Sequence, residues 1–174
     1  MKDLKVVTNY NEELIKKYMI DHFFIRTKKV KIVINIIIVV CTILTALLII
    51  NTKTISNFSI ICLFIYLIGF IEFNTSILPN RSFKKLKKSS KVTLNVENNY
   101  TFSKENIKIA TLTGSSTINY QDIYQCIEVK NAYYIYISDR QAFIVDKEQL
   151  SQEENEKLGK ILSSKIKNYT KINK

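Results

Sequence analysis

The stretch NAYYIYISDRQAFIVDK, residues 131–147, decides the fold of the C-terminal half of this chain. It predicts two short strands, at 132–137 and 141–145, joined through the polar turn at 138–140. A hairpin with one face in water should alternate apolar and polar residues, but both of these strands are apolar at nearly every position. Other parts of the protein must therefore cover both faces of the hairpin.

The residues that follow the hairpin predict one of these covers. Ser151 and Glu154 have the S-x-x-E spacing of a capping box, which marks the start of a helix. Four aliphatic residues then share one face at helical spacing: Leu158, Ile161, Leu162 and Ile166. This C-terminal helix, or an opposite sheet, would cover the hairpin, and its tyrosines could keep their hydroxyl groups in water.

Alternating segments before the hairpin predict an antiparallel meander of short strands. We expect these strands at 91–97, 100–103, 106–112, 115–120 and 123–130. Turns are expected at 98–99, 104–106, 114–115 and 130–131. Ile107, Ile109 and Leu112 would mark an inward face, and the whole would be a small curved sheet closed by the C-terminal helix.

The first half of the chain is dominated by two apolar runs. Residues 32–50, IVINIIIVVCTILTALLII, are uncharged and long enough to cross a bilayer as a helix. A second run at 58–78 stays apolar as far as Ile71, meets Glu72, and is expected to end at Pro79. We predict two transmembrane helices, about 32–50 and 57–77, with Glu72 near the headgroups or paired with a nearby lysine. A role of Glu72 or Asn35 inside the membrane stays open.

The charges that flank these runs predict the orientation of the helical hairpin. The link between the runs holds only Lys53, whereas the outer flanks are basic. The positive-inside rule therefore predicts that both termini are cytoplasmic, with the basic flanks facing an anionic leaflet. The basic flanks are Arg26, Lys28, Lys29, Lys31, Arg81, Lys84, Lys85, Lys87 and Lys88.

The N-terminal region is predicted to contain a strand and a helix. LKVVT at 4–8 could be an extra edge strand of the β domain, and 11–25 could be an amphipathic helix on the inner membrane surface. The predicted organisation is an N-terminal cytoplasmic segment at 1–28, the two spans within 29–80, a basic linker at 81–90 and a β domain at 91–174. The fold class is therefore an α+β membrane protein.

Two segments resemble the C-terminal domain of the YcxB-like family of bacterial membrane proteins: YTFSKENIKI at 100–109 and INYQDIYQCIEVKNAYYIYISDRQAFIVDKEQLSQEE at 118–154. The resemblance implies a pleckstrin-homology-like fold, a bent antiparallel sheet capped by one helix, behind two transmembrane helices. The chain departs from the family at 120–122, where many relatives have Trp-Ser-Asp, and at Asp146, where proline is frequent. The family has no established reaction, so the resemblance implies an architecture and no activity.

Residue types that carry chemistry are sparse in this sequence. Its net charge of +11 is concentrated beside the apolar runs, which favours a membrane over a nucleic-acid partner. The one histidine, His22, lies in the expected N-terminal helix, and the chain has three glycines and no glycine-rich phosphate loop. The three cysteines have no metal-ligand spacing, and four carboxylates are expected to be solvated: Glu97, Asp122, Glu128 and Asp139. We predict no enzyme activity, cofactor or metal.

These observations lead to three hypotheses of function. The first is a membrane-anchored cytoplasmic interaction module that modulates a protein partner at the inner membrane face. The second is a self-protection protein against a membrane-active bacteriocin or toxin, which deletion of the gene would reveal as a change in toxin sensitivity. The third is an oligomeric transport subunit built from the hairpins, although their polar content is thin for a pore. Homo-oligomers are compatible with each.

Overall fold

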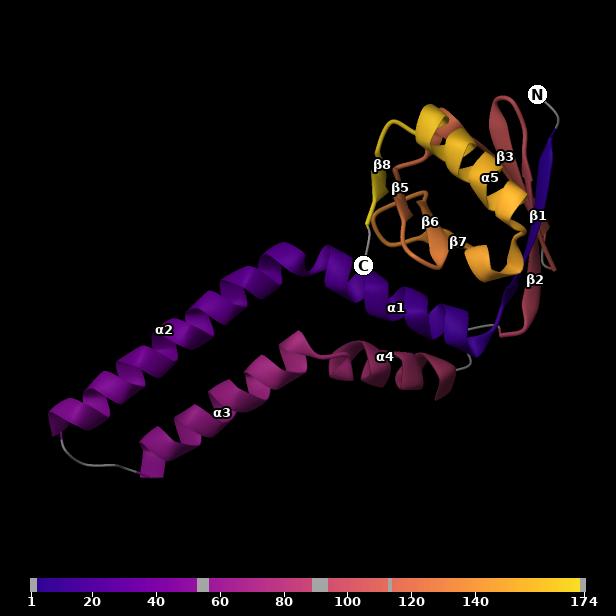
Figure 1. Cartoon of the computed structure of the whole chain (residues 1–174). Helices are drawn as coiled ribbons and strands as arrows, with labels where there is room; N and C mark the ends of the chain where they lie inside the picture. Colours follow the sequence, from indigo (N-terminus) through magenta and orange to yellow (C-terminus); the bar gives the residue numbers. More distant parts are fainter. Residues whose placement is uncertain (1–2, 53–56, 89–93, 113, 173–174) are drawn as a thin grey trace. The chain divides into compact units, whose positions relative to one another are not determined.

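The protein consists of two structural units, seen here in a computed structural model that describes residues 3–52, 57–88, 94–112 and 114–172. The first unit combines Met1–Tyr18 with Thr93–Lys174 and contains the strands, and the second unit is Met19–Val92 and is helical (Figure 1). The helical unit is therefore inserted, in chain order, between two parts of one β unit.

The β unit contains two four-stranded sheets. The first has the order β1 (Leu4–Tyr10), β2 (Val96–Phe102), β3 (Asn106–Thr111), β4 (Gly114–Asn119), with every pair antiparallel. The second has the order β7 (Ala142–Asp146), β6 (Ala132–Tyr136), β5 (Gln125–Glu128), β8 (Tyr169–Lys171). Strand β8 pairs parallel to β5, and the other pairs of this sheet are antiparallel. The chain is thus a mixed α+β protein with largely antiparallel sheets.

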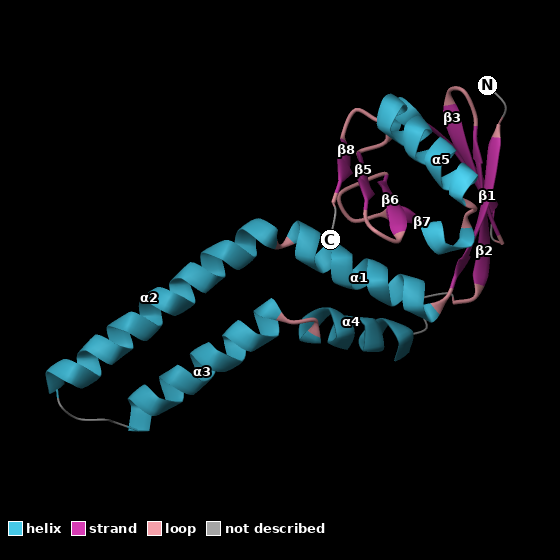
Figure 2. Ribbon diagram, in the orientation of Figure 1, coloured by secondary structure: helices cyan, strands magenta, loops and turns pink. Residues whose placement is uncertain are grey.

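One apolar core joins the two sheets and the C-terminal helix. Tyr100 and Phe102 of β2 belong to the same buried cluster as Tyr133 of β6 and Leu158 and Leu162 of helix α5 (Gln152–Lys165). Figure 2 shows α5 beside both sheets. Burial of these large side chains, each worth about 1.5–3 kcal/mol, stabilises the unit. Helix and opposite sheet together therefore cover one face of the predicted hairpin.

The start of helix α1 (Glu12–Arg26) covers the other face. Strand β6 is buried at all five of its positions, and β5 and β7 are largely buried. Tyr134, which alternates with the core residue Tyr133, meets Tyr18 of α1 edge-on, with ring centroids 5.2 Å apart. Leu14 and Ile15 of α1 are buried as well. For this half of α1 a protein surface takes the place of the membrane surface that the sequence suggested.

The N-terminal strand predicted at 4–8 is present and extends to Tyr10, so the β unit is larger than the 91–174 segment. Its register pairs Val6 with Tyr100 and Thr8 with Asn98. Asn98 is consequently buried inside β2, and the turn predicted at 98–99 is wrong, because pairing with β1 holds this segment extended. Residues 91–93 of the first predicted strand lie outside the described residues.

Three further expectations about the β unit need correction. The structure has two sheets in place of one meander, because the 3-10 turn Tyr120–Asp122 separates β4 from β5. Leu112 is 78% exposed and marks no inward face, since β3 ends at Thr111. Strand β8 was not predicted, because three residues with no alternation carry too little pattern.

The predicted capping box of the C-terminal helix is confirmed. Ser151 Oγ accepts a hydrogen bond from Glu154 N at 3.3 Å, and Glu154 Oε2 accepts one from Ser151 N at 2.9 Å. Leu158, Ile161 and Leu162 are buried on one face, as the spacing indicates. Helix α5 therefore begins where the sequence places it.

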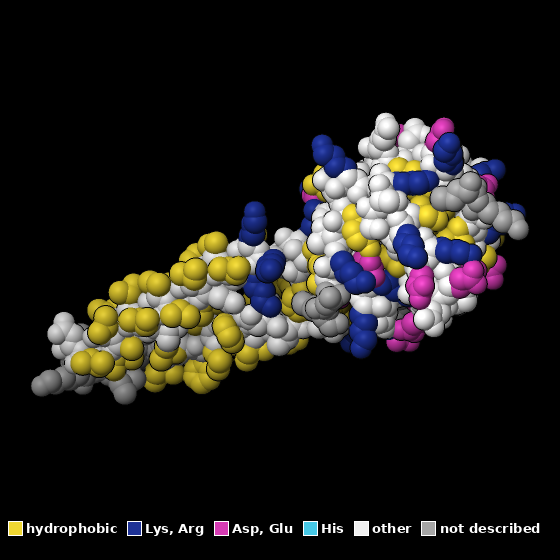
Figure 3. Space-filling view, turned by 45° about the horizontal axis from the view of Figure 1, so that its top comes forward, with side chains coloured by type: hydrophobic (Ala, Val, Ile, Leu, Met, Phe, Trp, Pro, Cys, Tyr) yellow, Lys and Arg dark blue, Asp and Glu magenta, His cyan; other side chains and the backbone are white. Residues whose placement is uncertain are grey.

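The second unit contains helices α2 (Lys28–Thr52), α3 (Asn57–Asn74) and α4 (Ile77–Lys88). Within the described ranges, one helix segment, Lys28–Asn51, is by itself long and apolar enough to cross a membrane, and an 18-residue stretch of it has a mean hydropathy of 3.0. Helices α3 and α4 would count as a second only if taken as one broken span, because they meet at 67°. Figure 3 shows hydrophobic side chains along these helices.

The second apolar run ends earlier than the sequence predicts. Helix α3 stops at Asn74, and Pro79 lies in the first turn of α4 instead of ending a helix. Proline is tolerated there because the first N–H groups of a helix have no intrahelical partner. The segment predicted as a basic linker is therefore helical as far as Lys88.

Candidate functional site

The predicted basic flanks all lie at helix ends or on α4. Arg26 ends α1, and three lysines occupy the beginning of α2, where no acidic residue offsets them. Positive charge is unfavourable at a helix N-terminus by about 0.3–1 kcal/mol per residue, so these lysines do not stabilise α2. Five further basic residues lie on α4: Arg81, Lys84, Lys85, Lys87 and Lys88.

Helix α4 has an apolar face among these basic residues. Pro79 and Phe83 are buried, and Leu86 follows at the next helical position of the same face. This spacing was present in the sequence, but the apparent helix stop at proline hid it. An amphipathic helix rich in lysine is typical of the membrane interface.

Two polar contacts tie the helices of the second unit together. Asn35 Nδ2 donates to Asn74 Oδ1 at 3.2 Å, and Asn74 Nδ2 donates back to Asn35 Oδ1 at 2.9 Å, joining α2 to α3. Glu72 forms an ion pair with Arg81, so its partner is an arginine where the sequence suggested a lysine. The polar residues singled out in the apolar runs thus contact groups within the same unit.

We expect the replacement of Asn35 by alanine to weaken the pairing of α2 with α3 by about 0.6–2 kcal/mol, because a reciprocal amide pair is lost. Asn74→Ala should have a similar effect, and the double variant should lose little more than either single one. Unfolding of the purified protein in mixed micelles, analysed as a double-mutant cycle, measures this coupling. Fully additive losses would show that the two amides do not interact.

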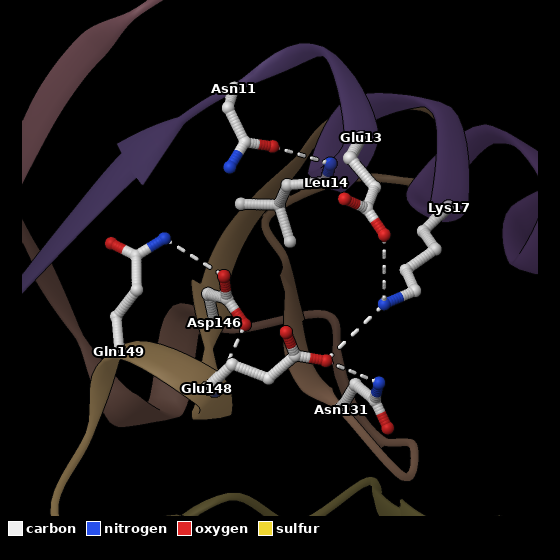
Figure 4. Close-up of polar contacts among 8 residues, drawn as sticks. All are labelled: Asn11, Glu13, Leu14, Lys17, Asn131, Asp146, Glu148 and Gln149. Atoms are coloured by element: carbon white, nitrogen blue, oxygen red, sulfur yellow. Dashed lines mark hydrogen bonds and ion pairs between the residues drawn. The ribbon is translucent and has the colours of Figure 1, made fainter.

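A polar network holds the beginning of α1 on the β unit (Figure 4). The side-chain oxygen of Asn11 caps the helix by accepting a hydrogen bond from Leu14 N at 2.8 Å. Lys17 of α1 contacts Glu148 at 3.3 Å and Glu13 at 3.7 Å. Glu148 in turn accepts from Asn131, at the start of the hairpin, at 2.5 Å.

Strand β1 is joined to the second sheet by buried hydroxyl groups. Tyr10 Oη accepts a hydrogen bond from Ile144 N of β7 at 2.7 Å and lies 2.8 Å from Tyr100 Oη. Thr8 Oγ1, fully buried, accepts from Asp146 N at 3.4 Å. Burial raises the pKa of both Tyr10 and Tyr100, which keeps these hydroxyl groups neutral. The N-terminal segment is therefore bound by backbone pairing and side chains alike.

A buried carboxylate lies at the end of β5. The side chain of Glu128 is 8% exposed and contacts Lys147 at 2.7 Å, Lys171 at 3.0 Å and the hydroxyl of Tyr169. Burial by itself raises the pKa of Glu128, but hydrogen bonds from Lys147, Tyr169 and Lys171 lower it on balance. The expectation of a solvated Glu128 is wrong because its partners, distant in sequence, converge on it.

The charged groups around Glu128 are held in fixed positions by further contacts. Lys147 also lies over the ring of Tyr133, 4.4 Å from its centroid, which fixes the ammonium in place. Nearby Cys126 is fully buried, and burial raises the pKa of its thiol to about 12, so it stays protonated. Among the residues that the structure describes, no three His, Cys, Asp or Glu side chains gather as a metal site.

Polar hollows lie on the surface of the β unit. One, of about 490 Å³, is lined by Lys104, Glu105, Asn119, Tyr120, Gln121 and Lys165. The other, of about 460 Å³, is lined by Tyr124, Gln125, Lys167, Asn168, Tyr169 and Thr170. Polar, lysine-bearing hollows suit contact with a macromolecule better than enclosure of a small apolar ligand.

Comparison with known proteins agrees with the resemblance seen in the sequence. A family model described as YcxB-like protein matches residues 102–162, from the end of β2 to within α5. No curated protein and no solved structure matches the chain. The matched segment includes the hairpin β6–β7 and the capped start of α5, the same residues that carry the resemblance. The chain therefore contains a YcxB-like domain at residues 102–162.

Proposed function

We propose that this protein is a non-catalytic interaction module anchored in a bacterial membrane, which presents its β unit to a protein partner at the cytoplasmic face. The observation that carries the proposal is the combination, in one chain, of a fully packed β unit and the apolar helix segment Lys28–Asn51, in which an 18-residue stretch has a mean hydropathy of 3.0. Such a helix is stable when lipid covers its exposed side chains.

In this proposal α2 and α3 form a hairpin of two transmembrane helices, and both termini of the chain lie in the cytoplasm. Helix α3 has 18 residues, which correspond to about 27 Å of helix, close to the thickness of a bilayer core. The bend before α4 supports a placement of α4 along the headgroups, with its exposed lysines toward anionic lipid and the buried Phe83 packed against the protein. Each lysine would contribute about 1 kcal/mol of attraction to an anionic leaflet.

The β unit is proposed to be a variant of the pleckstrin-homology-like architecture. Largely antiparallel sheets with a C-terminal helix beside them support this assignment, together with the match to the YcxB-like family. The two sheets use β1 and β8 from opposite ends of the chain. The proposed module is thus complete only when its N-terminal strand is present.

Cysteine accessibility tests the orientation. In a variant with Cys41→Ala and Cys62→Ala, a cysteine is introduced at Lys53 or at Arg140, while buried Cys126 stays as it is. A membrane-impermeant maleimide should label Lys53→Cys in intact cells and Arg140→Cys only after the membrane is opened. Labelling of Arg140→Cys in intact cells would refute the cytoplasmic placement.

In-cell photocrosslinking tests the interaction. A photoreactive residue at exposed positions of the β unit, Arg140 and Tyr124, is expected to capture one reproducible partner protein, identified by mass spectrometry. Full-length protein is used, because β1 belongs to the β unit. Crosslinks to the protein itself alone would contradict the module and favour an oligomer that acts through its membrane hairpin.

A further inference from the structure

The two sheets of the β unit have four edge strands, and three of them have features that hinder pairing with a further strand. Edges β1 and β7 are bridged to each other by Tyr10 and Thr8, whose hydroxyl groups accept hydrogen bonds from backbone N–H groups of β7. Edge β8 has three residues and ends on the charged Lys171. In the ranges covered by the structure, no strand lies beyond β4, the remaining edge, which has six residues.

Strand β4 lacks the features that protect natural sheet edges. Its sequence, GSSTIN, contains no charged residue and no proline, and every residue except the half-buried Ile118 is exposed. Natural proteins blunt a free edge with lysines, proline, bulges or a very short strand, because an open edge pairs readily with another chain. An unprotected edge of this length is suited to accept an added strand.

The register shows which backbone groups of β4 are available. Tyr120 N donates to Glu105 O at 3.4 Å, one step beyond the last pair of the β3–β4 ladder. Hydrogen-bonded and non-hydrogen-bonded pairs alternate along antiparallel strands. Ser115, Thr117 and Asn119 therefore direct their backbone N–H and C=O groups away from β3, toward the open edge.

A row of side chains that includes two lysines leads to the middle of this edge. Across the first sheet, Lys5 of β1 pairs with Thr101 of β2, Thr101 with Lys108 of β3, and Lys108 with Thr117 of β4. Both lysines are exposed, on the face opposite to the core. A residue added beside Thr117 would extend this row and lie two strands, about 10 Å, from the backbone of Lys108, a distance that a long acidic side chain and the lysine side chain can bridge.

The far end of β4 adds to this positive potential. Asn119, its last residue, lines the hollow that also contains Lys104 and Lys165, against one acidic side chain, Glu105. Lys165 donates to the carbonyl oxygens of Ser103, at 3.2 Å, and Lys104, so its ammonium is held beside the hollow. Asn119 Nδ2 also donates to Asp122 Oδ2 at 3.0 Å, and this carboxylate offsets part of the charge at the end of the edge, so a negatively charged neighbour is favoured most at the middle, beside Lys108.

We propose that the edge of β4 binds an extended segment of a partner protein, with an acidic side chain opposite Thr117. The segment adds a fifth strand to the first sheet through Ser115, Thr117 and Asn119, and its carboxylate lies near Lys108. This inference rests on the proposed function and names the surface and the chemistry of the partner. A second copy of the chain fits less well, because its own β4, GSSTIN, has no acidic residue to place opposite Thr117.

The test compares substitutions at two positions, Lys108 and Lys130, in the full-length protein in cells. A photoreactive residue at Thr117 is expected to capture a partner segment that contains acidic residues, and the substitution Lys108→Glu should abolish this product. Lys130→Glu, an exposed lysine in the turn between β5 and β6, is the matched control and should leave the product unchanged.

A synthetic peptide of the captured segment then probes the binding mode. Added to the protein in lipid nanodiscs, it should slow hydrogen exchange of the amides of Ser115, Thr117 and Asn119. Replacement of the acidic residue opposite Thr117 by glutamine should weaken binding by up to about 5-fold, which corresponds to about 1 kcal/mol for the lost charge pair. Unchanged hydrogen exchange of these three amides on addition of the peptide would overturn the inference. Equal binding of the acidic peptide and its glutamine variant would overturn it as well.

The outcomes separate this inference from the proposed function. Capture of a partner from Tyr124 but not from Thr117 leaves the interaction module standing and refutes the β4 edge as its site. Crosslinks from Thr117 only to lipid or to a second copy of the chain also refute it. If neither position captures another protein, the proposed function fails together with the inference.

Discussion

Replacement of Tyr134 by alanine is expected to lower the free energy of unfolding of the β unit by about 3–5 kcal/mol, as large aromatic-to-alanine changes in cores do. The side chain is 1% exposed, and its ring meets Tyr18 at 5.2 Å on the face of the hairpin that α1 covers. The substitution therefore removes the contact between the N-terminal and C-terminal chain segments of the β unit, and it leaves a cavity under α1.

Near-UV circular dichroism during chemical denaturation measures this loss. Of the ten tyrosines, nine lie in the β unit and one, Tyr66, in α3, so the signal reports the β unit. Tyr124→Ala is the control, because this side chain is 47% exposed and its loss should cost under about 1 kcal/mol. Equal small losses for both variants would show that α1 does not cover the hairpin.

The second large effect is expected for Glu128→Gln, which removes a buried charge and keeps the side-chain volume. Lys147, with an 11% exposed side chain, then keeps an uncompensated charge, and the free energy of unfolding should fall by about 3 kcal/mol. Lys171→Gln removes the more exposed partner, 58% exposed, and should cost about 1 kcal/mol or less.

The same carboxylate predicts a pH dependence. Because the pKa of Glu128 in the folded protein lies below its ordinary value of 4.5, its stabilising contribution is full above that value. The contribution is lost as the pH falls from 4.5 through the lowered pKa of the folded state. Denaturation curves between pH 7 and pH 3 should converge for the native protein and Glu128→Gln. A constant difference over this range would refute the assignment.

Much of the β unit could be predicted from local patterns. The apolar hairpin implied covers on both faces, and the capping box of Ser151 and Glu154 gave the start of α5, because both signals act within a few residues. The identity of the second cover could not be predicted. Leu14, Ile15 and Tyr18 form an apolar helix face that suits a membrane surface as well as a sheet, and only the fold selects between them.

Contacts between distant segments explain the remaining differences. The residue types of Asn98 and Asn99 predict a turn, but both residues pair with β1 and are therefore part of strand β2. The position of Glu128 at the end of a predicted strand suggested that its side chain is solvated. In the structure it contacts Lys147, from the segment between β7 and α5, and Lys171, from strand β8. The open edge of β4 is likewise a property of sheet order, which alternation along one strand does not contain.

Hydrogen exchange of the full-length protein in nanodiscs tests most directly the central claim, that the first residues of the chain complete the β unit that recognises a partner. The amides of β1 (Leu4–Tyr10) should exchange as slowly as those of β2, and both should exchange faster to the same degree in Tyr134→Ala. Exchange of β1 at the rate of an exposed peptide, beside a protected β2, would contradict the account.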